Sequence, residues 1–331
     1  MYQEFYKLNT HPFRLSPDPS FVCMTEQHRE ALSGLVYSVC TRPGLSVLLG
    51  EAGTGKTTIL YTLVGLLERR HYLTAMCTNP TLSRDEFYEF LLLKFGVNCT
   101  SPSKTRQLIA LEDALKRRRG QGHLAVLIMD EAQRLPADLL EEVRLLLNIE
   151  TPQEKLVEIV LAGQPELGNT LRRPEMRQLK QRVGSVCTLR PLNLEEVGEY
   201  IDHRLKQAGR TEPSMFSEAS LELLYAYSGG IPRLINTLAD TALRAGFALQ
   251  SPSITPFIVH EASNELELTR LTPPEQVPAQ NEVVACLDAK LREGVAGEVS
   301  PGNNAGTVPL ESYASRQKSL GFFSQWLGRW K

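Results

Sequence analysis

The most constraining feature of this chain is a glycine-rich segment between an apolar run and a helical pattern. Residues 50–57 read Gly-Glu-Ala-Gly-Thr-Gly-Lys-Thr and fit the pattern G-x-x-x-x-G-K-[ST] at every fixed position. Residues 45–49 are mainly apolar and suit a buried strand, and residues 57–70 repeat leucine and valine at helical spacing. A glycine turn that matches this pattern by chance would rarely lie between a strand and a helix. The segment therefore predicts a phosphate-binding loop.

Each residue type in this loop suits a triphosphate. Unpaired backbone N–H groups at a helix start attract anions, and the glycines let the backbone approach the phosphates closely. Lys56 supplies positive charge for the β- and γ-phosphates, and the Thr57 hydroxyl is a ligand for Mg²⁺. The predicted nucleotide-binding residues are Gly50, Glu51, Ala52, Gly53, Thr54, Gly55, Lys56, Thr57 and Thr58.

A second apolar run, residues 125–129, ends in two adjacent carboxylates. Asp130 is expected to hold Mg²⁺, directly or through water, and Glu131 to polarise the attacking water. The alternative is a pair of exposed acids that open the helix expected at residues 136–148, because acids favour helix starts. Together with the phosphate-binding loop, the pair predicts an enzyme that hydrolyses a nucleoside triphosphate.

The pattern of elements predicts an α/β domain followed by a helical one. The length of 331 residues allows roughly two domains and a tail. We expect a lead-in over residues 1–40, a nucleotide-binding domain over 41–190 and a helical lid over 191–268. Residues 269–331 are expected to form a flexible tail, because they are rich in proline and glycine.

Expected strands are 45–49, 73–78, 124–130, 157–162 and 186–189. Expected helices are 25–40, 55–70, 83–95, 104–119, 136–148, 174–182, 193–208, 217–228, 232–249 and 256–268. Strands that alternate with helices predict a parallel sheet covered on both faces.

Composition limits the cellular compartments and the binding partners that this protein is expected to have. The net charge of −2 does not favour a strongly nucleic-acid-binding surface. No apolar run reaches the ~20 residues of a membrane span, and the N-terminus lacks the features of a secretory signal. The six cysteines form no C-x-x-C pair, which favours reduced thiols over a metal site. We therefore expect a cytoplasmic protein.

Two further polar residues are candidates for contacts with the γ-phosphate. Gln164 follows the strand expected at 157–162, where it would orient water; the alternative is an amide that caps the next helix. Arg233 follows a Gly-Gly-Ile-Pro turn at a helix start, where the helix dipole repels a cation, so it needs an anionic partner such as this phosphate. The alternative for Arg233 is a solvent-exposed side chain.

A cluster of basic residues precedes the last expected strand: Arg172, Arg173, Arg177, Lys180 and Arg182. An arginine here would act as a finger that reaches the γ-phosphate of a neighbouring subunit. Arg182 is the favoured candidate because it lies at the helix-to-strand corner. The alternatives are a solvated basic face and a DNA contact.

With these parts placed, the chain resembles the AAA+ ATPases and, within them, the general secretion pathway protein A (ExeA-type) family. The segments that carry the resemblance are residues 12–19, 28–32, 50–58, 130–133, 163–167, 177–182, 200–205 and 230–236, and it covers residues 1 to about 268. It implies an αβα nucleotide domain with a helical lid, the strand order 5-1-4-3-2, ATP with Mg²⁺, and a ring or another homo-oligomer. It also implies that Pro17 and Asp18 lie against the adenine. The same resemblance puts Gln164, Arg182 and Arg233 at the sensor 1, arginine-finger and sensor 2 positions.

The end of the chain departs from the longer members of this family. Those members carry a transmembrane helix and a periplasmic peptidoglycan-binding domain after the ATPase, so a short form is expected here. Residues 319–331 hold both tryptophans and place Leu320, Phe323, Leu327 and Trp330 on one helical face beside basic residues. This pattern suits contact with a membrane surface or a partner groove, which would make the protein peripheral at the inner membrane. The alternatives are that the segment packs on the ATPase domain or is disordered.

Three functions fit the sequence. The favoured one is an ATPase that serves an envelope assembly for secretion, pilus formation or polysaccharide export. The second is a DNA-associated ATPase of the transposition or origin-recognition kind, and the third is an adaptor that hydrolyses ATP slowly.

Overall fold

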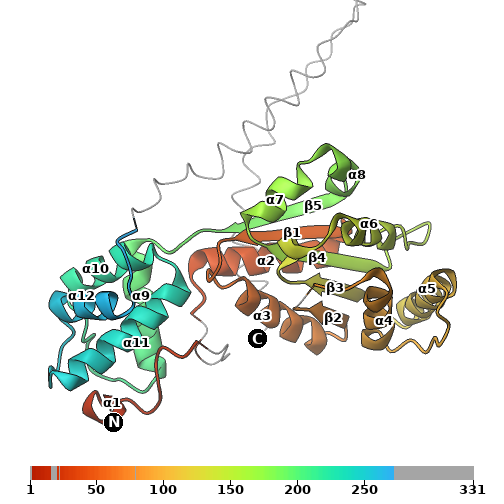
Figure 1. The fold of residues 1–331 in the computed structure, drawn as a ribbon. Helices are drawn as coiled ribbons and strands as arrows, with labels where there is room; N and C mark the ends of the chain where they lie inside the picture. The colour runs from red at the N-terminus through yellow and green to blue at the C-terminus, as the bar shows by residue number, and fades with distance from the viewer. Residues whose placement is uncertain (1, 16–20, 22, 79, 272–331) are drawn as a thin grey trace, which may run out of the picture. The chain divides into compact units, whose positions relative to one another are not determined.

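The computed structural model describes residues 2–15, 21, 23–78 and 80–271, which form an α/β part and a helical part (Figure 1). The predicted adenine contact at Pro17 and Asp18 and the aromatic segment at 319–331 both lie outside the described residues.

A five-stranded parallel sheet forms the centre of the α/β part. Its strands are β1 (Leu45–Gly50), β2 (Leu73–Cys77), β3 (Ala125–Met129), β4 (Val157–Gly163) and β5 (Val183–Leu189). The order β2-β3-β4-β1-β5 is the predicted order 5-1-4-3-2 read from the other edge, so the fold class is confirmed. β5 begins three residues before the predicted strand, because its exposed outer residues make the apolar pattern incomplete at this sheet edge.

The strand register places three strand ends beside one another. Leu49 of β1 pairs with Gly163 of β4, and Met129 of β3 pairs with Leu161 of β4. In a parallel sheet all these ends lie at the carboxyl edge, which is where α/β proteins bind ligands. The phosphate-binding loop, the carboxylate pair and Gln164 all follow strand ends at this edge.

Helices cover both faces of the sheet (Figure 1). The buried side chains of Val47, Leu127 and Ile159 form one core with α4 (Arg84–Lys94), α5 (Lys104–Gly120), α6 (Ala137–Leu146) and the helices after β4. Strand residues of the other parity face α2 (Glu26–Thr41) and α3 (Lys56–Arg69), and a 2.6 Å hydrogen bond joins the hydroxyls of Ser38 in α2 and Ser46 in β1. The expected coverage of both faces is therefore present.

The segment between β4 and β5 differs from its prediction. One helix was expected at residues 174–182. The structure has α7 (Pro165–Leu171), the 3₁₀ turn η3 (Pro174–Met176) and the short α8 (Arg177–Lys180). Both prolines occupy first helical positions, where proline is favoured, and Pro174 cannot continue the preceding helix. The prediction missed α7 because residues 165–171 are too few for a clear periodicity.

The helical part consists of α9 (Leu194–Gln207), α10 (Glu218–Ser228), α11 (Pro232–Ala248) and α12 (Pro256–Glu265). The capping box of Asn193 and Glu196 and the N-cap at Thr255 start two of these helices. Residues that the sequence placed in the lead-in also belong to this core: Tyr6 and Phe13 are each only 2% exposed, and α1 (Tyr2–Phe5) adds Tyr2. The lead-in thus divides, since its first residues pack with the helices and α2 packs on the sheet.

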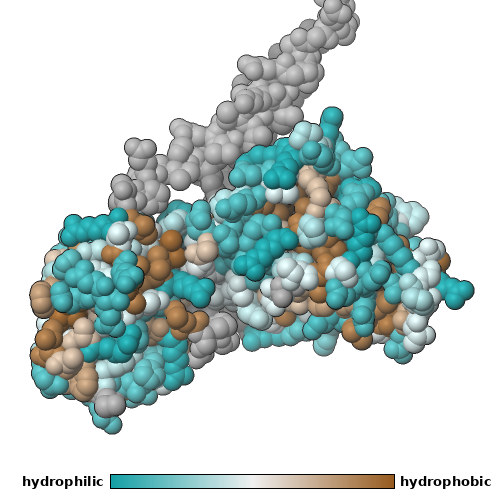
Figure 2. Space-filling model, viewed as in Figure 1, coloured by the Kyte–Doolittle hydropathy of each residue, from teal (hydrophilic) through white to brown (hydrophobic). Residues whose placement is uncertain are grey.

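The surface in Figure 2 is mostly hydrophilic, with separate hydrophobic patches, as is usual for a globular protein. Within the described ranges, every helix is too short or too polar to cross a membrane.

Candidate nucleotide-binding site

The phosphate-binding loop connects β1 to α3 at the carboxyl edge of the sheet. Gly53 and Gly55 have φ angles of 85° and 98°, a left-handed conformation that a residue with a Cβ rarely adopts. Glu51 and Ala52 are exposed, Thr54 is buried, and Thr58 lies in the first turn of α3. Two glycines of the loop thus have the left-handed backbone that their sequence positions predicted, and the loop leads directly into the first turn of α3.

The Lys56 side chain is 4% exposed and folds back over the loop. Its Nζ donates to the carbonyl oxygens of Gly50 at 2.7 Å and Glu51 at 2.9 Å. Burial lowers the pKa of this amine, and the nearby carboxylates of Glu131 and Asp130 oppose that shift. Lys56 is thus a desolvated cation beside the loop, where an anionic phosphate would stabilise its charge.

Thr57 and Asp130 join the loop to the end of β3. The Thr57 hydroxyl donates a 2.6 Å hydrogen bond to Oδ2 of Asp130, which is 2% exposed. These hard oxygen donors fit Mg²⁺, which usually takes one or two protein ligands and completes its shell with phosphate oxygens and water. The described residues contain no cluster of three or more His, Cys, Asp or Glu side chains suited to a metal.

Glu131 has a left-handed backbone conformation, with φ at 52°. Its N–H donates to Oδ1 of Asp130 at 2.9 Å, which connects the two adjacent acids. Its own Oε2 accepts a 2.7 Å hydrogen bond from Nε2 of Gln133. Glu131 does not open a long helix as the alternative required, because only the 3₁₀ turn η2 (Ala132–Arg134) follows and α6 begins at Ala137.

Gln164 follows β4 and occupies the N-cap position of α7. Its side chain makes no capping hydrogen bond there, in contrast to the alternative interpretation of this residue. Its backbone N–H donates to Oε1 of Gln133 at 3.1 Å. The structure therefore places Gln164 at the same sheet edge as Asp130 and Glu131.

Arg233 lies at the start of α11, beside the loop. Its backbone N–H is 3.3 Å from the carbonyl oxygen of Gly53, and a Cβ added to Gly53 would come 2.8 Å from the Cβ of Arg233. Its side chain is exposed and, in the described part of the chain, has no ion pair or hydrogen bond. This position leaves the guanidinium available for an anion held by the loop.

Arg182 is not brought together with the other candidates. It immediately precedes β5, and Val183 pairs with Leu45, the first residue of β1. Its Nη2 donates to Oδ1 of Asn148 at 3.0 Å. Arg182 thus lies at the amino edge of the sheet, whereas the loop follows the carboxyl end of β1.

Sequence reasoning assigned no role to His28, which contacts the loop from α2. Its Nε2 lies 3.0 Å from the carbonyl oxygen of Thr54, and its Nδ1 lies 2.5 Å from the Thr25 hydroxyl. Burial lowers the pKa of the His28 imidazole. The neutral ring thus donates to Thr54 and accepts from Thr25. Residues 28–32 carry part of the family resemblance, but no local sequence pattern predicts that His28 contacts Thr54, which lies 26 residues further along the chain.

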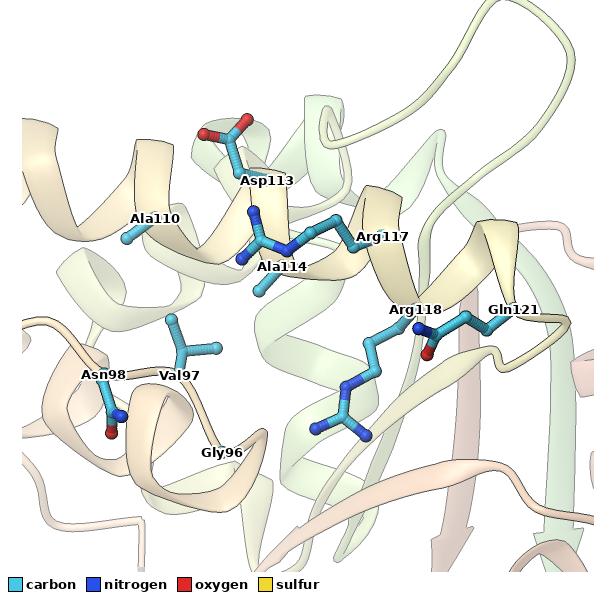
Figure 3. A pocket seen from close by; sticks show the side chains of 9 residues that line it. All are labelled: Gly96, Val97, Asn98, Ala110, Asp113, Ala114, Arg117, Arg118 and Gln121. Atoms are coloured by element: carbon cyan, nitrogen blue, oxygen red, sulfur yellow. The ribbon is translucent and has the colours of Figure 1, made fainter.

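A cavity of about 420 Å³ lies away from these residues, between the end of α4 and α5 (Figure 3). In the close-up, α5 carries Asp113, Arg117 and Arg118 along one side, and residues 96–98 lie opposite. None of the predicted site residues lines this cavity, so it is separate from the phosphate-binding loop.

Comparisons with known proteins bear on the family of this chain. A family model described as an AAA domain matches residues 40–171. General secretion pathway protein A of Aeromonas hydrophila is 39% identical over 255 residues, which are 77% of this chain and 46% of that protein. The chain thus spans less than half the length of this curated relative.

Solved structures with low sequence identity share the fold. Drosophila ORC bound to DNA matches with a TM-score of 0.61 and 16% identity over 81% of this chain and 66% of that one. The Aeropyrum pernix ORC2 protein, in ADPNP–ADP complexes, matches with a TM-score of 0.58 and 17% identity over 87% of this chain and 79% of that one. The chain therefore contains an AAA domain at residues 40–171 and is similar to general secretion pathway protein A, and the solved structures agree in fold.

Proposed function

We propose that this chain binds ATP with Mg²⁺ and hydrolyses it. The observation that carries the proposal is the 2.6 Å hydrogen bond between Thr57 and Asp130, which joins the phosphate-binding loop to the acidic end of β3. Residues 50–58 would hold the phosphates, with Lys56 as the cation and Thr57 and Asp130 as ligands of Mg²⁺. Bound Mg²⁺ would neutralise phosphate charge.

Glu131 would act as the base that polarises water. It directly follows Asp130, and its Oε1 accepts no hydrogen bond from the described residues. Gln164 would orient the water from the neighbouring strand end. Arg233 would contact the γ-phosphate from the start of α11, since its backbone is already at Gly53.

We further propose that the ATPase forms a homo-oligomer in the cytoplasm and serves an envelope secretion or export assembly. The identity to general secretion pathway protein A supports the envelope role, although the chain covers only 46% of that protein. The position of Arg182 on the opposite sheet edge from the loop supports the oligomer, because this side chain would reach a site only in a neighbour. Contact of residues 319–331 with a membrane surface stays a prediction from the sequence.

Two variants test the enzymatic proposal. We expect Lys56→Ala to abolish nucleotide binding, and Glu131→Gln to keep binding while turnover falls by about 10²–10⁴-fold, the usual contribution of a general base. Fluorescent ATP binding and phosphate release measure the two steps, and Glu89→Gln, at an exposed position of α4, is the matched control. Wild-type turnover in Glu131→Gln would show that the base lies elsewhere.

The same assay with DNA tests the biological role. An envelope ATPase is expected to hydrolyse ATP at the same rate with and without duplex DNA. Strong stimulation by DNA would instead favour the DNA-associated alternative and contradict the envelope proposal. The likeness to ORC structures bears on the fold alone, since identity there is below 20%.

A further inference from the structure

Gln133 connects the acidic residue after β3 to the junction between β4 and α7. Its Nε2 donates to Oε2 of Glu131 at 2.7 Å, and its Oε1 accepts from the backbone N–H of Gln164 at 3.1 Å. The two partners determine the orientation of this amide, because a carboxylate requires an N–H donor and a backbone N–H requires an oxygen. The side-chain amide therefore bonds through both of its polar atoms, to Glu131 two residues before it and to Gln164, 31 residues after it.

The close packing around Gln133 depends on Gly163, the last residue of β4. A Cβ added to Gly163 would lie 2.8 Å from Oε1 of Gln133, closer than real Cβ contacts allow. Glycine at this position thus lets the amide approach the strand end. Leu167 of α7 also packs here, at 3.0 Å from the same added Cβ.

This hydrogen bond has a chemical consequence for Glu131. An N–H donated to one carboxylate oxygen restricts the positions that the carboxylate can take. The other oxygen, Oε1, stays available to accept a proton from water. The left-handed backbone of Glu131 determines the direction in which its side chain leaves the main chain. The hydrogen bond from Gln133 holds the carboxylate at the other end of that side chain.

We propose that Gln133 is a positioning residue that holds the Glu131 carboxylate in place for water activation and ties it to the β4–α7 junction. This role rests on the proposed function, in which Glu131 polarises the attacking water. A displacement of α7 relative to β3 would move Gln133 and, through its hydrogen bond, the Glu131 carboxylate, so the rate of hydrolysis depends on the position of α7.

Two variants separate the two ends of this connection. Gln133→Met has a similar length but removes both hydrogen bonds, and we expect kcat to fall about ten- to a hundredfold while the KM for ATP stays within about twofold, as for a misplaced catalytic group. Gln133→Glu keeps an oxygen for Gln164 but places a second carboxylate beside Glu131. Its carboxylate has no N–H to donate to Glu131, so we expect kcat to fall by a similar factor while the KM for ATP stays within about twofold.

A double variant shows whether Gln133 acts through Glu131. In the Glu131→Gln background the positioned base is gone, so adding Gln133→Met should lower kcat no further. Gln153→Met, at an exposed position before β4, is the matched control and should leave kcat unchanged. Fluorescent ATP binding and thermal unfolding of each variant check that the site and the fold persist; if Gln133→Met does not fold, Gln133→Glu, of nearly equal volume, carries the test.

Three outcomes would overturn the role of Gln133. Wild-type kcat in Gln133→Met, together with slow turnover in Glu131→Gln, would reject the positioning role and leave the proposed function intact. A further loss of kcat in the double variant would show a merely structural role. Wild-type turnover in Glu131→Gln alone would reject the base itself, and the role of Gln133 with it.

Discussion

At the scale of single residues, a polar side chain lies at each end of β4. Gly163 and Gln164 at the carboxyl end contact Gln133, which belongs to the candidate site. At the other end, the Glu158 side chain is buried, and both of its oxygens accept hydrogen bonds from the backbone N–H of Gly44, at 3.0 and 3.2 Å. Burial raises the pKa of the Glu158 carboxyl to about 7, although the N–H of Gly44 opposes this shift.

This shift predicts a pH dependence of stability. The folded protein holds a proton on Glu158 up to about pH 7, whereas the unfolded chain loses it near the ordinary value of 4.5. Between these values the folded state binds more protons, so Glu158 makes the free energy of unfolding decrease as pH rises. Glu158→Gln has no proton to lose, and we expect its stability relative to the wild type to increase by about 2–3 kcal/mol between pH 5 and pH 8.

Urea unfolding of both proteins at several pH values measures this difference. Glu195→Gln, an exposed glutamate at the start of α9, is the control and should show no comparable change. A constant difference between Glu158→Gln and the wild type across this range would contradict a raised pKa.

At the scale of elements, a glycine turn brings the start of α11 to the phosphate-binding loop. Gly230 has φ at 74°, its carbonyl oxygen accepts a 2.8 Å hydrogen bond from the N–H of Leu192, and a Cβ added to it would lie 1.9 Å from the Leu192 oxygen. Two residues later α11 begins at Pro232, and the N–H of Arg233 meets Gly53. The close contact between the β5–α9 connection and the turn before α11 therefore requires glycine at position 230.

Gly230→Ala is expected to displace α11 from the loop. The added methyl group must push the Leu192 backbone away, and the left-handed conformation costs further energy in alanine. We expect ATP affinity to fall about tenfold or more, along with a loss of stability of about 1–3 kcal/mol from the strained turn. Titration with fluorescent ATP and thermal unfolding measure the two effects.

Gly120→Ala is the matched control, because nothing lies within 4 Å of a Cβ added at the end of α5. It should leave affinity unchanged. Wild-type ATP affinity in Gly230→Ala would show that the position of α11 at the loop does not matter for binding.

At the scale of the whole molecule, the sheet separates Arg182 from the loop of its own chain. The length of β1, from Leu45 to Gly50, corresponds to about 17 Å at the usual rise per residue. A side chain at the amino edge cannot act at the carboxyl edge of the same sheet. If Arg182 contacts a γ-phosphate, the nucleotide is bound by another copy of the chain.

Mixing of two inactive variants tests this arrangement. Arg182→Ala and Lys56→Ala should each lose turnover, by about 10³-fold or more for a finger. In an equal mixture, about a quarter of the sites would combine an intact Lys56 with an intact Arg182 from the neighbour, so activity should return in part. Steady-state phosphate release measures this recovery.

Arg172→Ala, an exposed member of the same basic cluster, is the control for the mixing experiment and should keep turnover. A loss in Arg182→Ala that no mixture restores would mean that Arg182 acts within its own chain or only through Asn148. Full activity of the Arg182→Ala variant alone would show that Arg182 has no role in the nucleotide-binding site.

Local patterns were enough to predict much of this protein. The P-loop between a strand and a helix, the acidic pair after an apolar run and the alternation of elements depend on residues close in the chain, and they indicated an α/β nucleotide-binding fold. The resemblance added the strand order, which the structure confirms. The short α7 escaped prediction because few residues specify it.

Contacts between distant segments are what only the tertiary structure decided. The bond from Gln133 to Gln164, the support of Thr54 by His28 and the place of Arg233 at Gly53 join residues from 26 to 180 positions apart. No periodicity encodes such pairs, because they depend on how strands align and where helices pack. The sequence by itself determined which chemical groups are present for a nucleotide; the packing of the sheet and helices determined which of them meet.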